Sequence, residues 1–215
     1  YFFAKRGAQA TMFKRADARG DRFCVVYEGE EGRSYASYTN HSHFLDAYKT
    51  IPEADRHFYE IIREVEPVRF YLDIEFKVTL RHDDDAQVRV SALLELCALA
   101  FKSGFDVSVD DTDWVILDGS RAVSAGWKHS YHVNLKHVYF ENNQIALKSF
   151  MTMLRSRIDA EHDPRLFCPE NDQEPIVDFG TNTKNRVWRL PLSSKLRNGT
   201  PLLFAADGTT ISDAL

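Results

Sequence analysis

An apolar run that carries two carboxylates stands at Phe70-Tyr71-Leu72-Asp73-Ile74-Glu75-Phe76. The alternation predicts a buried strand over residues 68–76, because successive side chains of a strand point to opposite faces. Asp73 and Glu75 then share one face, about 7 Å apart, while their apolar neighbours face a core. Like charges placed so close repel each other, and a divalent cation such as Mg²⁺ or Mn²⁺ would relieve the repulsion. By itself, an Asp-x-Glu pair is more often the acidic outer face of a half-exposed strand.

A second segment, Lys128-His129-Ser130-Tyr131-His132, falls within a strand expected over residues 130–135. Lys128, Ser130 and His132 would lie on one face of that strand and offer a point charge, a hydroxyl and an imidazole. Such a row can bind the oxygens of a triphosphate. Taken alone, the same pattern is typical of the polar outer face of an amphipathic strand.

A third acid, Asp178, stands in the apolar run Pro175-Ile176-Val177-Asp178-Phe179-Gly180. The stretch 184–197 that follows carries five Lys or Arg residues and no acid, and Lys184, Arg186, Arg189 and Lys195 are suited to phosphate contacts. In isolation a solvated basic hairpin explains this stretch equally well. If the three segments converge, they form a site for two divalent cations and a triphosphate.

The composition is that of a globular protein. The chain has 215 residues, 44% hydrophobic and 13% aromatic, enough for one large domain or two small ones that share a core. A net charge of −5 argues against a uniformly basic nucleic-acid binder. No apolar run reaches the length of a membrane span, and no signal-peptide pattern opens the chain. Because the chain begins with Tyr1, we expect a trimmed fragment of a longer protein.

The remaining patterns predict strands interleaved with helices, which favours an α/β or α+β fold. A hairpin is expected over residues 22–38, a helix after Asn40, a helix after Asp85 and a helix over 142–158. Short strands are expected at 114–117, 176–179, 187–190 and 202–205. Cys24, Cys97 and Cys168 are widely spaced and odd in number, so free thiols in an intracellular protein are predicted.

In this order, Asp-x-Glu, Lys-x-Ser-x-His, and apolar-Asp-x-Gly followed by Asn-Arg-x-x-Arg-Leu-x-x-Ser-Ser-Lys resemble the motifs of the archaeo-eukaryotic primase superfamily. The primase-polymerase (PrimPol) branch is the most similar, and the resemblance covers nearly the whole chain. It implies an α+β catalytic core in which residues 1–66 form a small N-terminal α/β module that contacts the template. Residues 67–215 would form a larger module that resembles an RNA-recognition (RRM-like) fold, with a central mixed or antiparallel sheet and the site in the cleft.

The resemblance also implies residue roles. Metal binding and catalysis would fall to Asp73, Glu75 and Asp178, with two Mg²⁺ or Mn²⁺ ions and no zinc in this fragment. Nucleotide binding would fall to Lys128, Ser130, His132, Arg189 and Lys195. Template or DNA contacts would fall to Arg6 and Gln9, in a segment that is similar to a template-binding stretch of the family, and to Lys184 and Arg186.

The function implied is template-directed addition of nucleoside triphosphates to a primer 3′ end, with primer synthesis as an extension, in DNA replication or damage tolerance. The expected partners are DNA template and primer, nucleoside triphosphates, and a helicase or single-strand-binding protein bound through segments outside the fragment. We expect a monomer without membrane contact, in the nucleus or a mitochondrion, or in viral replication machinery.

Two other functions remain open. Glu75-Phe76-Lys77 is the Glu-x-Lys of some metal-dependent nucleases, although no partner aspartate stands in a preceding strand. A catalytically silent module that binds single-stranded nucleic acid is the second alternative, and the presence of all three acids disfavours it.

Overall fold

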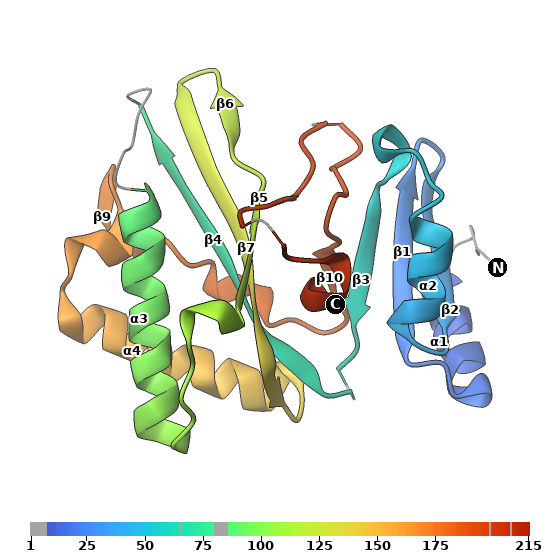
Figure 1. Cartoon of the computed structure of the whole chain (residues 1–215), viewed down its shortest axis with the longest axis horizontal. Helices are drawn as coiled ribbons and strands as arrows, with labels where there is room; N and C mark the ends of the chain where they lie inside the picture. The colour runs from blue at the N-terminus through green and yellow to red at the C-terminus, as the bar shows by residue number, and fades with distance from the viewer. Residues whose placement is uncertain (1–7, 65, 80–85, 198, 207) are drawn as a thin grey trace.

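The described residues form two larger antiparallel sheets, the small antiparallel pair β8–β9 and flanking helices, which confirms the α+β prediction (Figure 1). A computed structural model describes residues 8–64, 66–79, 86–197, 199–206 and 208–215. Within these ranges, no helix combines the length and the apolar character that a membrane crossing requires.

The elements follow one another in an order that mixes strands and helices throughout. The helices are α1 (Ala8–Arg19), α2 (His41–Tyr48), α3 (Ala86–Phe105), α4 (Lys148–Glu161) and α5 (Ile211–Ala214). The strands are β1 (Phe23–Gly29), β2 (Gly32–Tyr38), β3 (Phe58–Ile62), β4 (Val68–Val78), β5 (Trp114–Asp118), β6 (Arg121–Val123), β7 (Gly126–Phe140), β8 (Phe167–Cys168), β9 (Asn171–Pro175), β10 (Arg186–Arg189) and β11 (Leu203–Phe204).

The first sheet has the order β10-β3-β1-β2, and the predicted hairpin forms its β1–β2 edge. Its two faces are covered by different helices, as the strand alternation requires. Val26 of β1 packs with Met12 of α1, while Val25 packs with Phe44 of α2. As predicted, Asn40 caps α2, and its side chain accepts a hydrogen bond from the backbone N–H of His43 at 3.1 Å.

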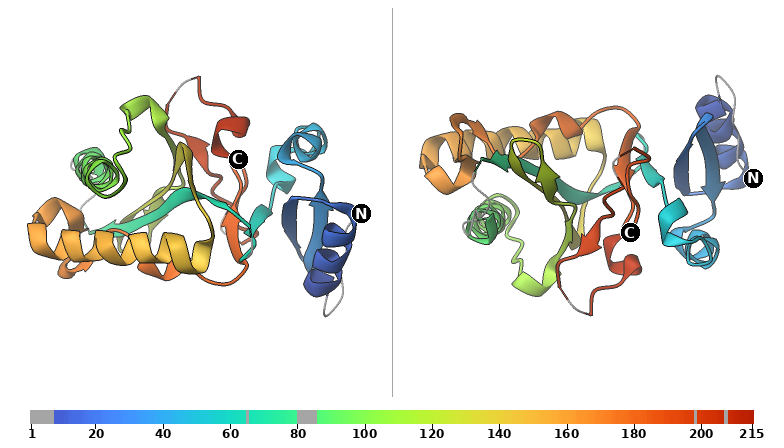
Figure 2. Two further views of the ribbon diagram at one scale, coloured as in Figure 1. Left: turned by 90° about the horizontal axis from the view of Figure 1, so that it is seen from below. Right: turned by 90° about the horizontal axis from the view of Figure 1, so that it is seen from above.

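The second sheet has the order β11-β5-β7-β4, with β6 paired to β7. The two longest strands, β4 and β7, both extend beyond the residues predicted from sequence. Alternate residues of β4, such as Leu72 and Ile74, are fully buried in the largest core cluster, which includes residues of α3 and α4. Figures 1 and 2 show these two helices on one side of the sheet, so the side chains of the other parity face away from them.

The predicted helices of the second half are confirmed, with one irregularity. The side chain of Asn142 accepts hydrogen bonds from the N–H groups of Ile145 and Ala146, and a single π-helical turn precedes α4. Helix α3 covers the residues predicted for it, but Asp85, its expected cap, lies outside the described residues.

The chain returns to the first sheet near its end, because β10 pairs antiparallel with β3. Residues after β10 then lie between the two sheets (Figure 2), where Leu202 and Ala214 pack against Val115 and Leu117 of β5. The division into modules at residue 66 therefore stays a prediction, and the second half of the chain supplies one strand of the first sheet.

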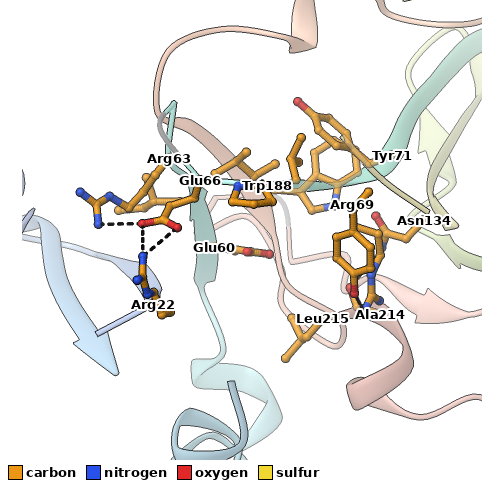
Figure 3. Close-up of a pocket in the computed structure, with 15 residues that line it drawn as sticks. Arg22, Glu60, Arg63, Glu66, Arg69, Tyr71, Asn134, Trp188, Ala214 and Leu215 are labelled. Carbon is orange, nitrogen blue, oxygen red and sulfur yellow. Dashed lines mark hydrogen bonds and ion pairs between the residues drawn. The ribbon is translucent and has the colours of Figure 1, made fainter. Parts of the chain in front are cut away.

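A cavity of about 120 Å³ separates β3 from β4, and Glu60 lines it (Figure 3). Glu60 stands directly opposite Trp188 in the β3–β10 pairing, so both side chains face the same way. Desolvation raises the pKa of Glu60 to about 7, although the nearby Arg69 lowers it. The ionised form of Glu60 is therefore disfavoured in the folded protein.

We predict that Glu60→Gln changes the pH dependence of stability. Between about pH 4.3 and 7, the unfolded chain loses the Glu60 proton while the folded chain keeps it, so wild-type stability falls as pH rises. The variant lacks this loss and should gain about 1–3 kcal/mol relative to wild type between pH 4.5 and 8. Urea unfolding at several pH values measures the difference, and two parallel stability profiles would contradict the prediction.

Candidate active site

The pairing of β4 with β7 brings the first two sequence motifs together. Directly opposite each other stand Asp73 and His132, Glu75 and Ser130, and Lys77 and Lys128. Directly opposed residues of an antiparallel pair project from the same face of the sheet. The two acids and the predicted phosphate-binding row therefore share the face that looks away from α3 and α4.

Asp178 joins this face from the other edge of β4. A bridge pairs Ile74 with Val177, the N–H of Asp178 donates to the carbonyl of Asp73 at 2.8 Å, and the N–H of Glu75 donates to the carbonyl of Ile176 at 2.8 Å. Antiparallel pairing then places Asp178 opposite Asp73, on the same face. The row across the sheet is His132, Asp73, Asp178.

The strand predicted over residues 176–179 is wrong, because pairing is limited to that one bridge. The chain turns into a 3₁₀ segment at Phe179–Thr181, and Asp178 is its cap. Asp178 Oδ1 accepts a hydrogen bond from the N–H of Gly180 at 2.7 Å. An Asp side chain that bonds a backbone group two residues on favours a turn over a continued strand.

A buried hydrogen-bond network fixes the segment that follows Asp178. The hydroxyl of Tyr71 donates to Asn143 Oδ1 at 3.0 Å and to the carbonyl of Thr181 at 3.1 Å. The Nδ2 group of Asn143 donates to the carbonyl of Thr183, and that of Asn182 donates to Asn143 Oδ1, each at 3.0 Å. Tyr71 lies on the same face of β4 as Asp73, so one strand positions both the acids and the turn.

The three carboxylates are close enough to perturb one another. Burial, followed by the charges of Asp178 and Glu75, raises the pKa of Asp73 to about 6. Two cations act in the opposite direction, namely Lys195 and Arg186, whose Nη2 lies 3.9 Å from Asp73 Oδ2. The ionised form of Asp73 is thus disfavoured in the folded protein.

The donor set fits a hard divalent cation in its chemistry, since carboxylate oxygens are the ligands that Mg²⁺ and Mn²⁺ prefer. Across the described ranges, however, no three His, Cys, Asp or Glu side chains are already arranged as a metal site. Glu75 instead forms an ion pair with Lys128, and Asp178 caps Gly180. The three carboxylates are the right kind of ligand for such a cation. To bind it, Glu75 would have to give up its ion pair with Lys128.

Three predicted cations gather next to these acids. Burial and the charges of Arg189 and Lys128 lower the pKa of Lys195, while Glu75 and Asp73 raise it. Arg189 is buried and donates from Nη1 to the carbonyl of Thr200 at 3.0 Å. Because the charges of Arg189 and Lys128 both act on Lys195, we treat these three residues as one positive cluster.

Gly119 holds part of this cluster against β7. Its N–H donates to the carbonyl of Ser130 at 2.8 Å. A Cβ atom at Gly119 would lie 3.1 Å from Arg189 Nη2 and 3.0 Å from Leu202 Cδ2. The missing side chain therefore lets the Arg189 guanidinium approach the phosphate-binding row.

His132 is buried and neutral. Its ring stacks on Trp188 with centroids 3.9 Å apart and an interplanar angle of 27°. Desolvation, followed by the charges of Arg189, Lys195 and Arg186, holds the pKa of His132 well below its ordinary value. In the described part of the chain, the buried Nδ1 atom of His132 has no hydrogen-bond partner. The imidazole is thus a neutral hydrogen-bonding group surrounded by cations.

Other predicted residues lie elsewhere or differ in their surroundings. Lys184 and Arg186 were both predicted as DNA contacts. Lys184 forms an ion pair with Glu64 at 2.7 Å, whereas Arg186 lies beside Asp73. Gln9 lies in α1, on the first sheet, whereas Arg6 is outside the described residues.

Sequence reasoning missed three residues that shape the site: Tyr71, Asn143 and Trp188. Tyr71 had a usable signal, because it stands two residues before Asp73 and so shares its face. Trp188 lies within the basic stretch, and its stacking on His132 depends on the pairing of β10 with β3 in the first sheet.

Comparison with known proteins gives two matches. A family model described as the C962R protein N-terminal AEP (archaeo-eukaryotic primase) domain matches residues 27–206. A DNA-directed primase/polymerase protein from Danio rerio is 23% identical over 214 residues, which cover 86% of this chain and 41% of the relative. The chain thus spans less than half the length of that relative.

The family model covers most of the chain, and the resemblance predicted from the motifs is confirmed. The chain belongs to the archaeo-eukaryotic primase family.

Proposed function

We propose that this chain is the catalytic core of a DNA primase-polymerase that extends a primer along a template. The observation that carries the proposal is the row His132, Asp73 and Asp178 across three paired segments, with the cations Lys128, Arg189 and Lys195 beside it. Membership in a primase family supports a nucleotidyl-transfer reaction at this row.

In the proposed reaction, the 3′-oxygen of the primer forms a bond to the α-phosphorus of the incoming triphosphate. The bond from that phosphorus to the bridging oxygen breaks, pyrophosphate leaves, and the proton of the hydroxyl passes to water. When bound, divalent cations would lower the pKa of the 3′-hydroxyl and neutralise charge on the pyrophosphate.

The residues of the chain have distinct tasks in this scheme. Asp73, Glu75 and Asp178 hold the cations by their carboxylate oxygens. Lys195 and Arg189 neutralise the β- and γ-phosphates as charge shifts onto the leaving group. The folded chain already positions Arg189 through its bond to Thr200, so this guanidinium needs little reorganisation.

Lys128, Ser130 and His132 form the hydrogen-bonding side of the phosphate site. Lys128 lies within reach of Glu75, and its ammonium can pass from that carboxylate to a phosphate oxygen. His132 stays neutral because it is buried and its neighbours are cations, so it binds a phosphate oxygen through a ring N–H without adding charge. Trp188 holds the imidazole plane by stacking.

We predict that Asp73→Ala combined with Glu75→Ala abolishes nucleotide incorporation. The double variant keeps one carboxylate, which is too few ligands to hold the ions against a primer and a triphosphate. Extension of a labelled primer on a template in Mg²⁺ or Mn²⁺ measures the effect. Wild-type-like extension by the double variant would refute the proposed mechanism.

The same assay distinguishes the two alternative functions. Cleavage of the labelled strand without triphosphates would support the nuclease. Binding without turnover by the wild type would support the silent module.

We predict that Lys195→Ala raises the KM for the nucleotide by about 10- to 100-fold, because one charge-assisted phosphate contact is lost. Lys184→Ala is the matched control, because Lys184 is in the same basic stretch but pairs with Glu64. Steady-state extension at saturating primer gives both KM values. An equal effect of the two substitutions would show that only the general positive charge matters.

We predict that Asp73→Asn stabilises the protein without metal and removes its response to metal. The pKa of Asp73 is raised to about 6 in the folded protein, so folding favours the protonated carboxyl. The stability that this preference contributes is fully present below about pH 4 and is lost as the pH rises to about 6. At pH 7.5 the amide should add about 1–2 kcal/mol. Thermal unfolding with Mn²⁺ should raise the Tm of wild type and not that of the variant.

The exposed residue Asp55 supplies the control for that measurement. Asp55→Asn removes one carboxylate away from the site and should keep the full Mn²⁺ response. An identical Mn²⁺ response in Asp73→Asn would exclude Asp73 as a ligand.

A further inference from the structure

The catalytic row has a second side that the phosphate site does not occupy. On one side of Asp73 lies β7 with its phosphate-binding residues, and on the other lies the segment that carries Asp178. Beyond that segment opens a cavity of about 350 Å³, lined by Glu75, Arg155, Glu174, Val177, Asp178 and Phe179. Two of the three catalytic acids therefore form the wall between the phosphate site and this cavity.

Arg155 stands at the border of the cavity, on α4. Its Nε donates to both carboxylate oxygens of Asp159, at 3.0 and 3.1 Å, and its Cζ lies 5.6 Å from the centre of the Phe179 ring. Asp159 thus holds one edge of the Arg155 guanidinium, and the Phe179 ring lies next to it. Arg155 also lines a second cavity of about 560 Å³ with Asp159 and His162, so the guanidinium stands between the two cavities.

The reaction geometry requires an occupant on this side. In phosphoryl transfer, the attacking and leaving oxygens lie roughly in line on opposite sides of the phosphorus. The cations Arg189 and Lys195 draw the leaving pyrophosphate toward β7 and the first sheet. The attacking 3′-hydroxyl must then approach from the opposite side, where Asp178 and Glu75 face the cavity.

We infer that this cavity binds the 3′-terminal nucleotide of the primer and that Arg155 contacts the phosphodiester between the last two primer nucleotides. The inference rests on the proposed function and adds the position of the second substrate. Phe179 forms the apolar wall against the terminal sugar, and the second cavity receives the penultimate nucleotide.

The charges of the cavity favour a primer over a free initiating nucleotide. Glu75 and Asp178 would be balanced by the cations that they hold, which leaves one acid, Glu174, and one cation, Arg155, in the lining. One phosphodiester carries one negative charge and is matched by one guanidinium. A 5′-triphosphate in the same place carries several negative charges, and this single guanidinium does not balance them. The chain therefore extends primers more readily than it begins them.

Arg155→Ala tests the inference through primer binding. The KM for primer-template should rise about 10-fold, with the KM for the nucleotide unchanged, because one charge-assisted contact is lost. The slope of log affinity against log salt should fall by about 1, the signature of one phosphate contact. Arg155→Lys keeps the charge and should recover part of the affinity.

A control variant separates a specific primer contact from the general positive charge of α4. Arg157→Ala removes a neighbouring cation of the same helix, which donates to Ser103 instead, and it should leave the primer KM unchanged. A primer KM that rises equally in Arg155→Ala and Arg157→Ala would overturn the assignment of Arg155.

An equilibrium measurement makes the outcome independent of turnover. Anisotropy should show that wild type binds a primed template more tightly than the same strand unprimed, and that Arg155→Ala loses this increment. If wild type extends primers but Arg155→Ala keeps the increment, the primer subsite is wrong and the proposed function stands. If wild type gains nothing from the primer and extends nothing, both are wrong.

Glu174→Gln tests the charge argument. The amide keeps the hydrogen-bond acceptor that Asn171 uses and removes one negative charge, so dinucleotide synthesis on an unprimed template should rise relative to extension. An unchanged ratio of the two activities would overturn the preference assigned to the charges of the lining.

Discussion

The site depends on β4 being paired along both edges at the same residues. Asp73 is opposite His132 on one side and Asp178 on the other, so one strand gathers chemistry from three distant parts of the chain. The alternate residues Leu72 and Ile74 are fully buried against the helices. A slip of one residue in register would expose these side chains and bury the carboxylates. The apolar core on one face of β4 therefore fixes the positions of the polar groups on the other.

The network around Tyr71 extends this control to a segment without regular pairing. Asn143 is fully buried, and both ends of its amide are bonded, to Tyr71 and Asn182 on one side and to Thr183 on the other. A buried amide is favourable only when its partners are all in place, because leaving one unpaired costs about 1–3 kcal/mol. A buried polar network thus holds the turn after Asp178 and with it the position of this carboxylate.

The sequence predicted those features of the site that follow from side-chain alternation within one strand. The shared face of Asp73 with Glu75, and of Ser130 with His132, follows from the alternation of side chains along a strand. The pairing of residues between β4 and β7 could not be predicted in this way, because the core sets the register of the two strands. The strand predicted at 176–179 was wrong because an Asx turn at Asp178 competes with pairing. Lys184 and Arg186 look equivalent in sequence, yet a two-residue difference decides whether the cation meets Glu64 or Asp73.

The electrostatics of the site explain why its charges do not simply cancel. Burial, followed by neighbouring acids, raises the pKa of Asp73, and burial, followed by neighbouring cations, lowers the pKa of Lys195 and of His132. Desolvation and like-charge repulsion therefore both disfavour the charged form of each of these groups. A ligand that brings cations to the acids and a polyanion to Lys195 and Arg189 would relieve both repulsions at once. A metal-bound nucleoside triphosphate has that distribution of charge, and neither a metal ion nor a phosphate alone does. The two ends of the proposed site differ in charge for the same reason. Lys128, Arg189 and Lys195 offer several positive charges to a triphosphate, whereas Arg155 offers the cavity at α4 one guanidinium, which suits a single phosphodiester.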